Sequence, residues 1–153
     1  MEPILRTGEL DDDLVAALVR TAEFRTTLRR FLSSTAAAAT DAGLTPQRYD
    51  LLLMIQAGAA KGGHVTVGSL CDGLDLQQPA VTELVQRVEQ AGLVARSRSP
   101  HDGRVVHLRL TDEGEGRLVQ VFRALTADRA ALAEAFERLG DSFRASTSSP
   151  PTP

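Results

Sequence analysis

Five arginines between residues 84 and 110 are the side chains in this sequence best suited to bind an anionic partner. The same segment holds only two acidic residues, Glu89 and Asp102, so its formal charge is +3. The whole chain of 153 residues has a net charge of −3, and 16 of its 17 basic residues are Arg. The planar guanidinium of Arg suits both phosphates and base edges. The pattern therefore predicts a local nucleic-acid-binding segment in an otherwise acidic protein.

A helix predicted to begin near Pro79 and to end at Gly92 carries side chains that can read base edges. Its inward face consists of Val81, Leu84, Val85 and Val88. On the outward face, Gln can pair with adenine, Thr can contact a thymine methyl and Glu can accept from cytosine. Arg87 either reaches a phosphate or pairs with Glu83 one turn earlier. The residues of this helix predicted to contact DNA are Gln77, Gln78, Thr82, Glu83, Gln86 and Arg87.

A second group of candidates surrounds the polar segment 97–104, which lies between two predicted strands, 93–96 and 105–110. Arg104 at the tip is a candidate for insertion into a narrow minor groove, which attracts cations. Asp102 can hold the Arg104 guanidinium by a charge-assisted hydrogen bond; alternatively, the two form only a surface ion pair of little consequence. The hairpin residues predicted to contact DNA are Arg96, Arg98, Asp102, Gly103 and Arg104.

The elements before this hairpin follow the pattern of a helix-turn-helix. Thr66 is placed to cap a short helix that contains Leu70, Cys71 and Leu74. A turn through residues 72–75 then leads to the helix that begins near Pro79. A short helix, a tight turn and a second helix define the helix-turn-helix, and the hairpin that follows makes it a winged helix.

Two long helices flank this unit in the predicted organisation. The first begins at an Asp11 cap, with Leu10 stapled onto Val15, and ends near Gly43. A buried helix opens at Thr45-Pro46 and ends at Gly58. The last helix is predicted over residues 112–139 behind a Thr111 cap, and residues 140–153 are predicted to be a disordered tail. The predicted fold class is mainly α with a small β-hairpin.

Three motifs around the hairpin resemble the wing signature of the MarR (multiple antibiotic resistance regulator) family. They are Gly92-Leu93-Val94-Ala95-Arg96, Pro100-His101-Asp102-Gly103-Arg104 and Leu110-Thr111-Asp112-Glu113-Gly114. The resemblance covers roughly residues 10–139 and implies a winged helix-turn-helix DNA-binding domain over 45–111. It also implies that segments 10–43 and 112–139 form a dimerisation domain. The sequence departs from the family at Glu83, where a basic residue is common.

The resemblance implies a homodimeric transcriptional regulator that binds a pseudo-palindromic duplex operator, by default a repressor, and that responds to a small-molecule effector. The family places the effector between the dimerisation helices and the winged helix. The candidate effector residues are Phe24, Leu28, Phe31, Arg48, Tyr49 and Leu53. The alternative is a winged-helix protein-interaction module that has lost DNA binding, which Glu83 and the acidic total charge would suit.

Other kinds of function find little support in the sequence. No catalytic motif or phosphate-binding loop is present, so we expect no enzyme activity and no cofactor. His64, His101 and His107 do not have the spacing of a zinc site, and no metal is predicted. Cys71, the single cysteine, is interpreted as a small core residue. No segment has the apolar length of a membrane helix, so we expect a cytoplasmic protein.

Overall fold

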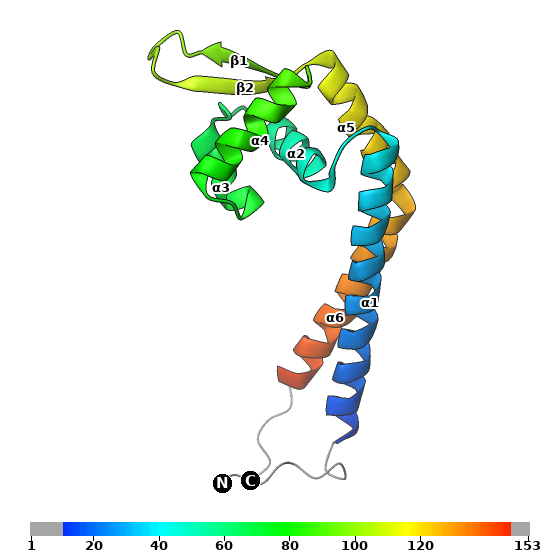
Figure 1. Cartoon of the computed structure of the whole chain (residues 1–153). Coiled ribbons are helices and arrows are strands. Elements are labelled where there is room, and N and C mark those ends of the chain that lie inside the picture. Colours follow the sequence, from blue (N-terminus) through cyan, green and yellow to red (C-terminus); the bar gives the residue numbers. More distant parts are fainter. Residues whose placement is uncertain (1–10, 148–153) are drawn as a thin grey trace, which may run out of the picture. The chain divides into compact units, whose positions relative to one another are not determined.

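The computed structural model describes residues 11–147, which form six helices and one two-stranded antiparallel sheet (Figure 1). In chain order the elements are α1 (Asp12–Asp41), α2 (Pro46–Ala60), α3 (Val67–Leu74), α4 (Gln78–Gln90), β1 (Val94–Arg98), β2 (Val106–Leu110), α5 (Asp112–Ala124) and α6 (Thr126–Thr147). This confirms the predicted mainly α fold with a winged helix-turn-helix. The predicted Leu10–Val15 staple lies outside the described residues.

The chain divides into two compact units. Unit 1 comprises the residues up to Ser34 and those from Leu125 onward, and unit 2 comprises Thr35–Ala124. In unit 1, α1 and α6 run side by side in opposite directions. Ser34 Oγ donates to Asp128 Oδ1 at 3.2 Å, and the rings of Phe24 and Phe136 lie 6.1 Å apart.

The core of unit 2 is built around α2. Leu51, Leu52 and Ile55 have no exposed surface, and α2 contacts α3, α4, α5 and β2. Burial of each such side chain stabilises the fold by about 1.5–3 kcal/mol. The nearly continuous apolar run of α2 is therefore explained by neighbours on most of its sides.

The helix starts follow the predicted caps. Asp11 Oδ1 accepts from the backbone N of Leu14 at 2.7 Å, and Thr45 Oγ1 accepts from Arg48 N at 3.2 Å. Thr66 and Ser69 form a reciprocal capping box at the start of α3. Each cap satisfies a backbone N–H group that has no acceptor within its helix.

Two predicted element boundaries are wrong because glycine serves close packing there and does not end a helix. The helix α2 runs past Gly58 to Ala60. A Cβ at Gly58 would lie 2.7 Å from Val65 Cγ2, so glycine lets these segments approach. Likewise Gly73 lies inside α3, and the turn falls after Leu74, where Asp75 takes a left-handed conformation with φ of 52°.

The final predicted helix is interrupted, and the predicted tail is partly helical. α5 ends at Ala124 and α6 begins at Thr126, although Arg129 N still donates to the Leu125 carbonyl at 2.9 Å. α6 continues to Thr147, so residues 140–147 are not a disordered tail. Adding a residue to a helix already formed is far easier than nucleating one. An ion pair between Arg144 and Asp141 supports this last part.

The strand pairing is antiparallel, with Val94 opposite Leu110 and Arg98 opposite Val106. Residues before α3 extend this pairing, because Leu108 N donates to the carbonyl of Val65 at 2.8 Å. Leu108 and Leu110 are buried, whereas Arg109 between them is exposed. This alternation confirms the predicted half-buried hairpin.

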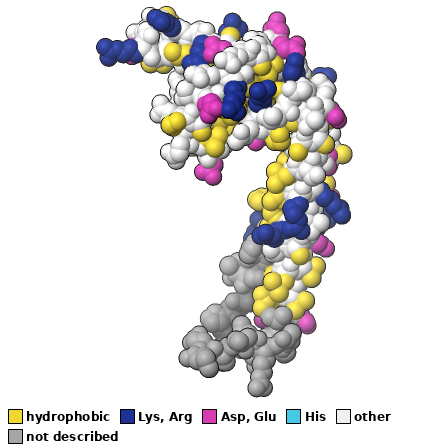
Figure 2. Space-filling view, in the orientation of Figure 1, with side chains coloured by type: hydrophobic (Ala, Val, Ile, Leu, Met, Phe, Trp, Pro, Cys, Tyr) yellow, Lys and Arg dark blue, Asp and Glu magenta, His cyan; other side chains and the backbone are white. Residues whose placement is uncertain are grey.

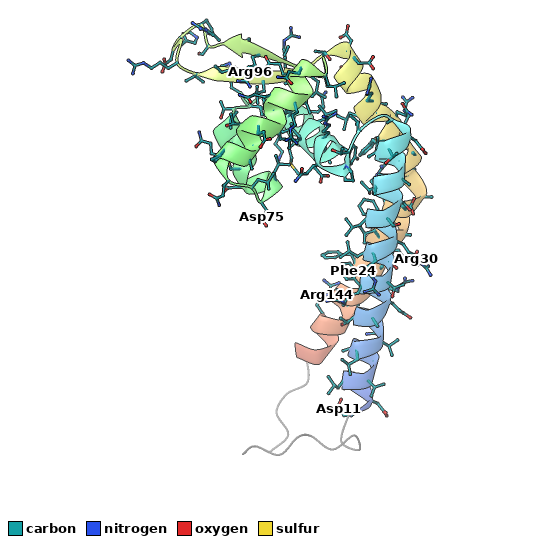
Figure 3. All side chains as sticks on the ribbon, viewed as in Figure 1. Asp11, Phe24, Arg30, Asp75, Arg96 and Arg144 are labelled. Atoms are coloured by element: carbon teal, nitrogen blue, oxygen red, sulfur yellow. The ribbon has the colours of Figure 1, made fainter. Side chains whose placement is uncertain are left out.

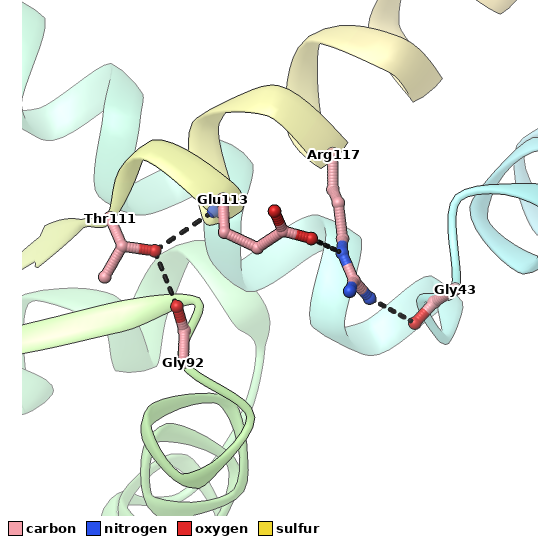
Figure 4. Close-up of polar contacts among 6 residues, drawn as sticks. Gly43, Gly92, Thr111, Glu113 and Arg117 are labelled. Atoms are coloured by element: carbon pink, nitrogen blue, oxygen red, sulfur yellow. Dashed lines mark hydrogen bonds and ion pairs between the residues drawn. The ribbon is translucent and has the colours of Figure 1, made fainter.

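A compact junction joins the end of α4 to the start of α5 (Figure 4). Thr111 Oγ1 donates to the Gly92 carbonyl at 2.6 Å and accepts from Gly114 N at 3.1 Å. Thr111 N donates to the Leu93 carbonyl at 3.1 Å. A Cβ built at Gly114 would lie only 2.0 Å from that carbonyl oxygen. The motif that begins at Gly92-Leu93 and the motif that contains Thr111 and Gly114 are therefore in direct contact with each other.

Gly114→Ala should destabilise unit 2 by about 3 kcal/mol, because neither backbone segment can move aside without disturbing buried neighbours. Gly116→Ala is the matched control, since a Cβ there meets nothing within 4 Å. It should stabilise the helix by up to about 1 kcal/mol. Urea denaturation followed by circular dichroism measures both changes. Equal stability of the two variants would contradict the close contact.

Candidate nucleic-acid interface

The outward face of α4 presents the residues predicted to read DNA. Val81, Val85 and Val88 are fully buried and hold α4 against unit 2. The predicted contact residues Gln77, Gln78, Glu83, Gln86 and Arg87 are exposed, and Thr82 is half-buried. A depression of about 470 Å³ is lined by Gln78, Pro79, Thr82, Glu83 and Gln86. The helix therefore presents a row of polar side chains on the side away from the core.

The geometry of Thr82 restricts what this residue can contact. Its Oγ1 donates to the backbone carbonyl of Gln78 at 2.8 Å. The hydroxyl proton is therefore committed within the helix, and the methyl group and the oxygen lone pairs remain for an external group. A thymine methyl is the base feature that suits a threonine methyl.

Arg87 forms an ion pair with Glu83 one turn earlier. This is one of the two arrangements left open by the sequence. The two side chains are 60% and 63% exposed, so the pair lies at the surface. The pair contributes little to the stability of the fold. It does, however, place the Glu83 carboxylate against the Arg87 guanidinium.

Arg96, which the sequence predicts to contact a phosphate, forms an ion pair within the protein. Its Nε lies 2.7 Å from Glu89 Oε2, which links β1 to the last turn of α4. Both side chains are only about one-third exposed. Sequence reasoning missed Glu89, because an acid seven residues before a strand arginine gives no periodic signal. Figure 3 labels Arg96 on the hairpin.

Asp102 shapes the hairpin tip through the backbone, and not through the predicted contact with the Arg104 guanidinium. Asp102 Oδ1 accepts from the Arg104 backbone N at 2.9 Å, and the Asp102 carbonyl accepts from Val105 N at 3.0 Å. Ser99 Oγ accepts from the N–H groups of His101 and Asp102. Gly103 does not have a positive φ, so the turn does not need glycine for that reason.

The side chains of three other hairpin arginines, Arg98, Arg104 and Arg109, are exposed to solvent. Within residues 11–147, no protein partner is found for the side chains of Arg98, Arg104 or Arg109. Figure 2 shows basic side chains at the outer end of the hairpin, which is the upper left of that view. These cations remain available to an external anion.

One cleft brings the two predicted groups together. It has a volume of about 400 Å³, and its lining includes Gln78 and Thr82 from α4 and Arg96 and Arg104 from the hairpin. Thr66 and Gly68, at the start of α3, line it as well. Residues of the helix and of the wing thus face a common space within unit 2.

The remaining candidates do not form a site within unit 2. Cys71 is half-buried, and its Sγ approaches the Val67 carbonyl at 3.5 Å, so it is not the core residue predicted. His107 stacks on His64, with ring centroids 4.1 Å apart. In the described part of the chain, no group of three or more His, Cys, Asp or Glu is arranged to hold a metal ion. No described helix has the length and hydropathy to cross a membrane.

The six predicted effector residues are divided between the two units. Phe24, Leu28 and Phe31 belong to unit 1, where they line an apolar groove of about 420 Å³. Its other lining residues are Arg129, Leu132, Ala133 and Phe136 of α6. Arg48, Tyr49 and Leu53 belong to α2 in unit 2. Tyr49 is 5% exposed and takes part in the core.

The fold and this surface define a winged helix-turn-helix protein, and comparisons with known proteins show which family this part of the chain resembles. Residues 42–105 match the model of the MarR family. The HTH-type transcriptional repressor MdtR of Bacillus subtilis (strain 168) is 34% identical over 79 residues, which cover 52% of this chain and 48% of MdtR. The chain spans about half the length of the curated relatives it matches.

Two solved structures show the same fold. YusO from Bacillus subtilis has a TM-score of 0.62 at 20% identity, and the match covers 92% of this chain and 100% of YusO. A mutant of MarR from E. coli, complexed with operator DNA, has a TM-score of 0.61 at 20% identity. That match covers 79% of this chain and 83% of MarR. Residues 42–105 of this chain are therefore similar to the MarR family, which the three sequence motifs also resemble.

Asp102→Ala should loosen the hairpin tip, whereas Asp102→Asn should leave it nearly unchanged. The Asn side-chain oxygen can still accept from the Arg104 N–H, and the net value of such a bond is about 1 kcal/mol. The expected result is amide exchange at residues 99–105 that is about fivefold faster in Asp102→Ala alone. Hydrogen–deuterium exchange measures it. Equal acceleration in both variants would show that the negative charge is what matters.

Proposed function

We propose that this chain is a sequence-specific transcriptional regulator that binds double-stranded DNA as a homodimer. The observation that carries the proposal is the common cleft between α4 and the hairpin, where Gln78 and Thr82 lie with Arg96 and Arg104. A helix presented by a helix-turn-helix reads base edges in the major groove. A cationic hairpin tip beside it suits the adjacent backbone and minor groove.

The names of the relatives support this role. MdtR is named as a transcriptional repressor, and the MarR mutant from E. coli was solved with operator DNA. In this chain, Gln77, Gln78 and Gln86 would pair with adenine, and the Thr82 methyl would contact thymine. Arg98 and Arg104 would contact phosphates or the minor groove. We assign the protein no catalytic activity and no cofactor, and we place it in the cytoplasm.

The apolar surface of unit 1 supports the homodimer. Leu14, Leu18 and Leu32 of α1 are 45%, 52% and 57% exposed, and Phe136 of α6 is 64% exposed. Leu14 and Leu32 are separated by five whole helical turns, so they project from the same side of α1. Figure 2 shows hydrophobic side chains along this pair of helices. Exposed apolar surface of this extent marks an interaction site, and a second copy of the same helices would cover it.

A dimer also doubles the DNA contacts. Two copies of α4 related by a two-fold axis would read a pseudo-palindrome with half-sites about 10 base pairs apart or a multiple of that. A small-molecule effector would act by favouring a dimer whose two helices do not fit this spacing. The candidate effector residues in unit 1 remain Phe24, Leu28 and Phe31, and those in unit 2 remain Arg48, Tyr49 and Leu53.

A second candidate function is a protein-interaction module that does not bind DNA. The acidic residues Glu83 and Glu89 on α4 favour it, since a DNA-reading helix is usually not acidic. The two functions differ in a direct measurement. A protein-interaction module would bind no duplex even at low salt, whereas the proposed regulator would bind any duplex weakly and its operator tightly.

The first test is a footprint on the DNA that flanks the gene, followed by a salt titration of the protected site. Arg104→Ala should weaken binding and make the dependence of log K on log salt shallower by about 0.9 for each protomer. Arg104→Lys should keep the slope because it keeps the charge. Arg144→Ala, at an ion-paired arginine of unit 1, should bind as the wild type. A slope unchanged in Arg104→Ala would exclude the hairpin from the interface.

A charged side chain in place of Leu32 tests the proposed dimer interface. Leu32→Glu should leave the protomer folded, because this side chain is 57% exposed. Loss of two buried leucines across the interface costs about 3–6 kcal/mol, and dissociation should therefore rise at least about 100-fold. Leu32→Met keeps an apolar side chain and should dimerise normally. Sedimentation velocity measures the state, and a Leu32→Glu dimer of wild-type affinity would contradict this interface.

A further inference from the structure

The helix α4, which we propose reads the bases, has no basic side chain outside an ion pair. Its charged residues are Glu83, Arg87 and Glu89. Glu83 holds Arg87, and Glu89 holds Arg96 from β1. Both carboxylates of α4 are thus paired with a guanidinium. The side chains beside Glu83 that we propose contact bases, Gln78, Thr82 and Gln86, are neutral.

We propose that Glu83 limits non-specific DNA binding by holding Arg87 away from the phosphates. This inference rests on the proposed DNA-binding function. Sequence-independent affinity grows with the number of phosphates that a protein neutralises. A guanidinium paired with a carboxylate on the same helix neutralises that carboxylate instead of a phosphate. Because discrimination depends on the ratio of specific to non-specific binding, withholding one cation raises that ratio.

The position of Glu83 distinguishes this ion pair from one that only supports a helix. Glu83 lines the depression on α4 together with Gln78, Thr82 and Gln86, so its carboxylate lies among the reading groups. The side chains of Glu83 and Arg87 are more than half exposed and would meet an approaching duplex. In α6, Glu134 and Arg138 form a pair of the same spacing, but it lies in unit 1 and outside the interface.

The experiment measures binding to a random-sequence duplex between about 50 and 200 mM salt by fluorescence anisotropy. Glu83→Gln should release Arg87 and add about one phosphate contact per protomer, which steepens the slope of log K against log salt by about 1.8 for a dimer. Affinity should then fall about 12-fold more than that of the wild type over this range. Glu83→Gln/Arg87→Gln should return to the wild-type slope. Glu134→Gln, the matched loss of a paired carboxylate, should also keep it.

Three results would overturn the inference. An unchanged slope in Glu83→Gln would show that Arg87 is not withheld. A double variant with a slope shallower than that of the wild type would show that Arg87 already contacts a phosphate. Failure of the wild-type protein to bind any duplex would overturn the proposed function and this inference together. Circular dichroism of each variant verifies that α4 remains folded.

Discussion

The contact between Gly114 and the Leu93 carbonyl is the constraint on which the arrangement of α4 and the hairpin in unit 2 depends. It joins the end of α4, the start of β1, the end of β2 and the start of α5 within a few residues. Thr111 completes it with one hydrogen bond to the Gly92 carbonyl and another from Gly114 N. Because α4 and the hairpin both emerge from this junction, their relative orientation is fixed there. The cleft lined by Gln78, Thr82, Arg96 and Arg104 lies between the two elements that this junction orients.

Most of unit 2 could be predicted from local sequence patterns. Caps such as Thr45 and Thr66, and the buried stripe of α4, depend on residues within four positions of one another. The apolar spacing could not reveal the interruption at Leu125, since the buried positions continue across it. Gly58 and Gly73 were misinterpreted for a similar reason. Their role is to admit Val65 and Met54, neighbours that only the tertiary structure supplies.

The exposure of the predicted contact residues follows from the sequence, whereas some of their contacts do not. The predicted contact residues of α4 and the arginines Arg98, Arg104 and Arg109 are exposed as expected, except that Thr82 is half-buried. Arg96 and Asp102, however, make contacts within the protein that the sequence did not predict. Glu89 holds Arg96, and the Asp102 carboxylate accepts from a backbone N–H. A sequence shows that acids and arginines are near in the chain. It does not show which donor a carboxylate faces, because rotamers and the hairpin register decide that.

The turn at the hairpin tip has a consequence for how such a protein diversifies. Its shape is maintained by Ser99, Asp102 and the backbone of residues 99–105, with no contribution from the core. Exposed positions in that loop can thus vary in evolution without compensating changes elsewhere. In α4, by contrast, the exposed polar residues lie between Val81, Val85 and Val88, which the core holds in place. New target preferences should arise first at the wing and later, under tighter constraint, in the helix.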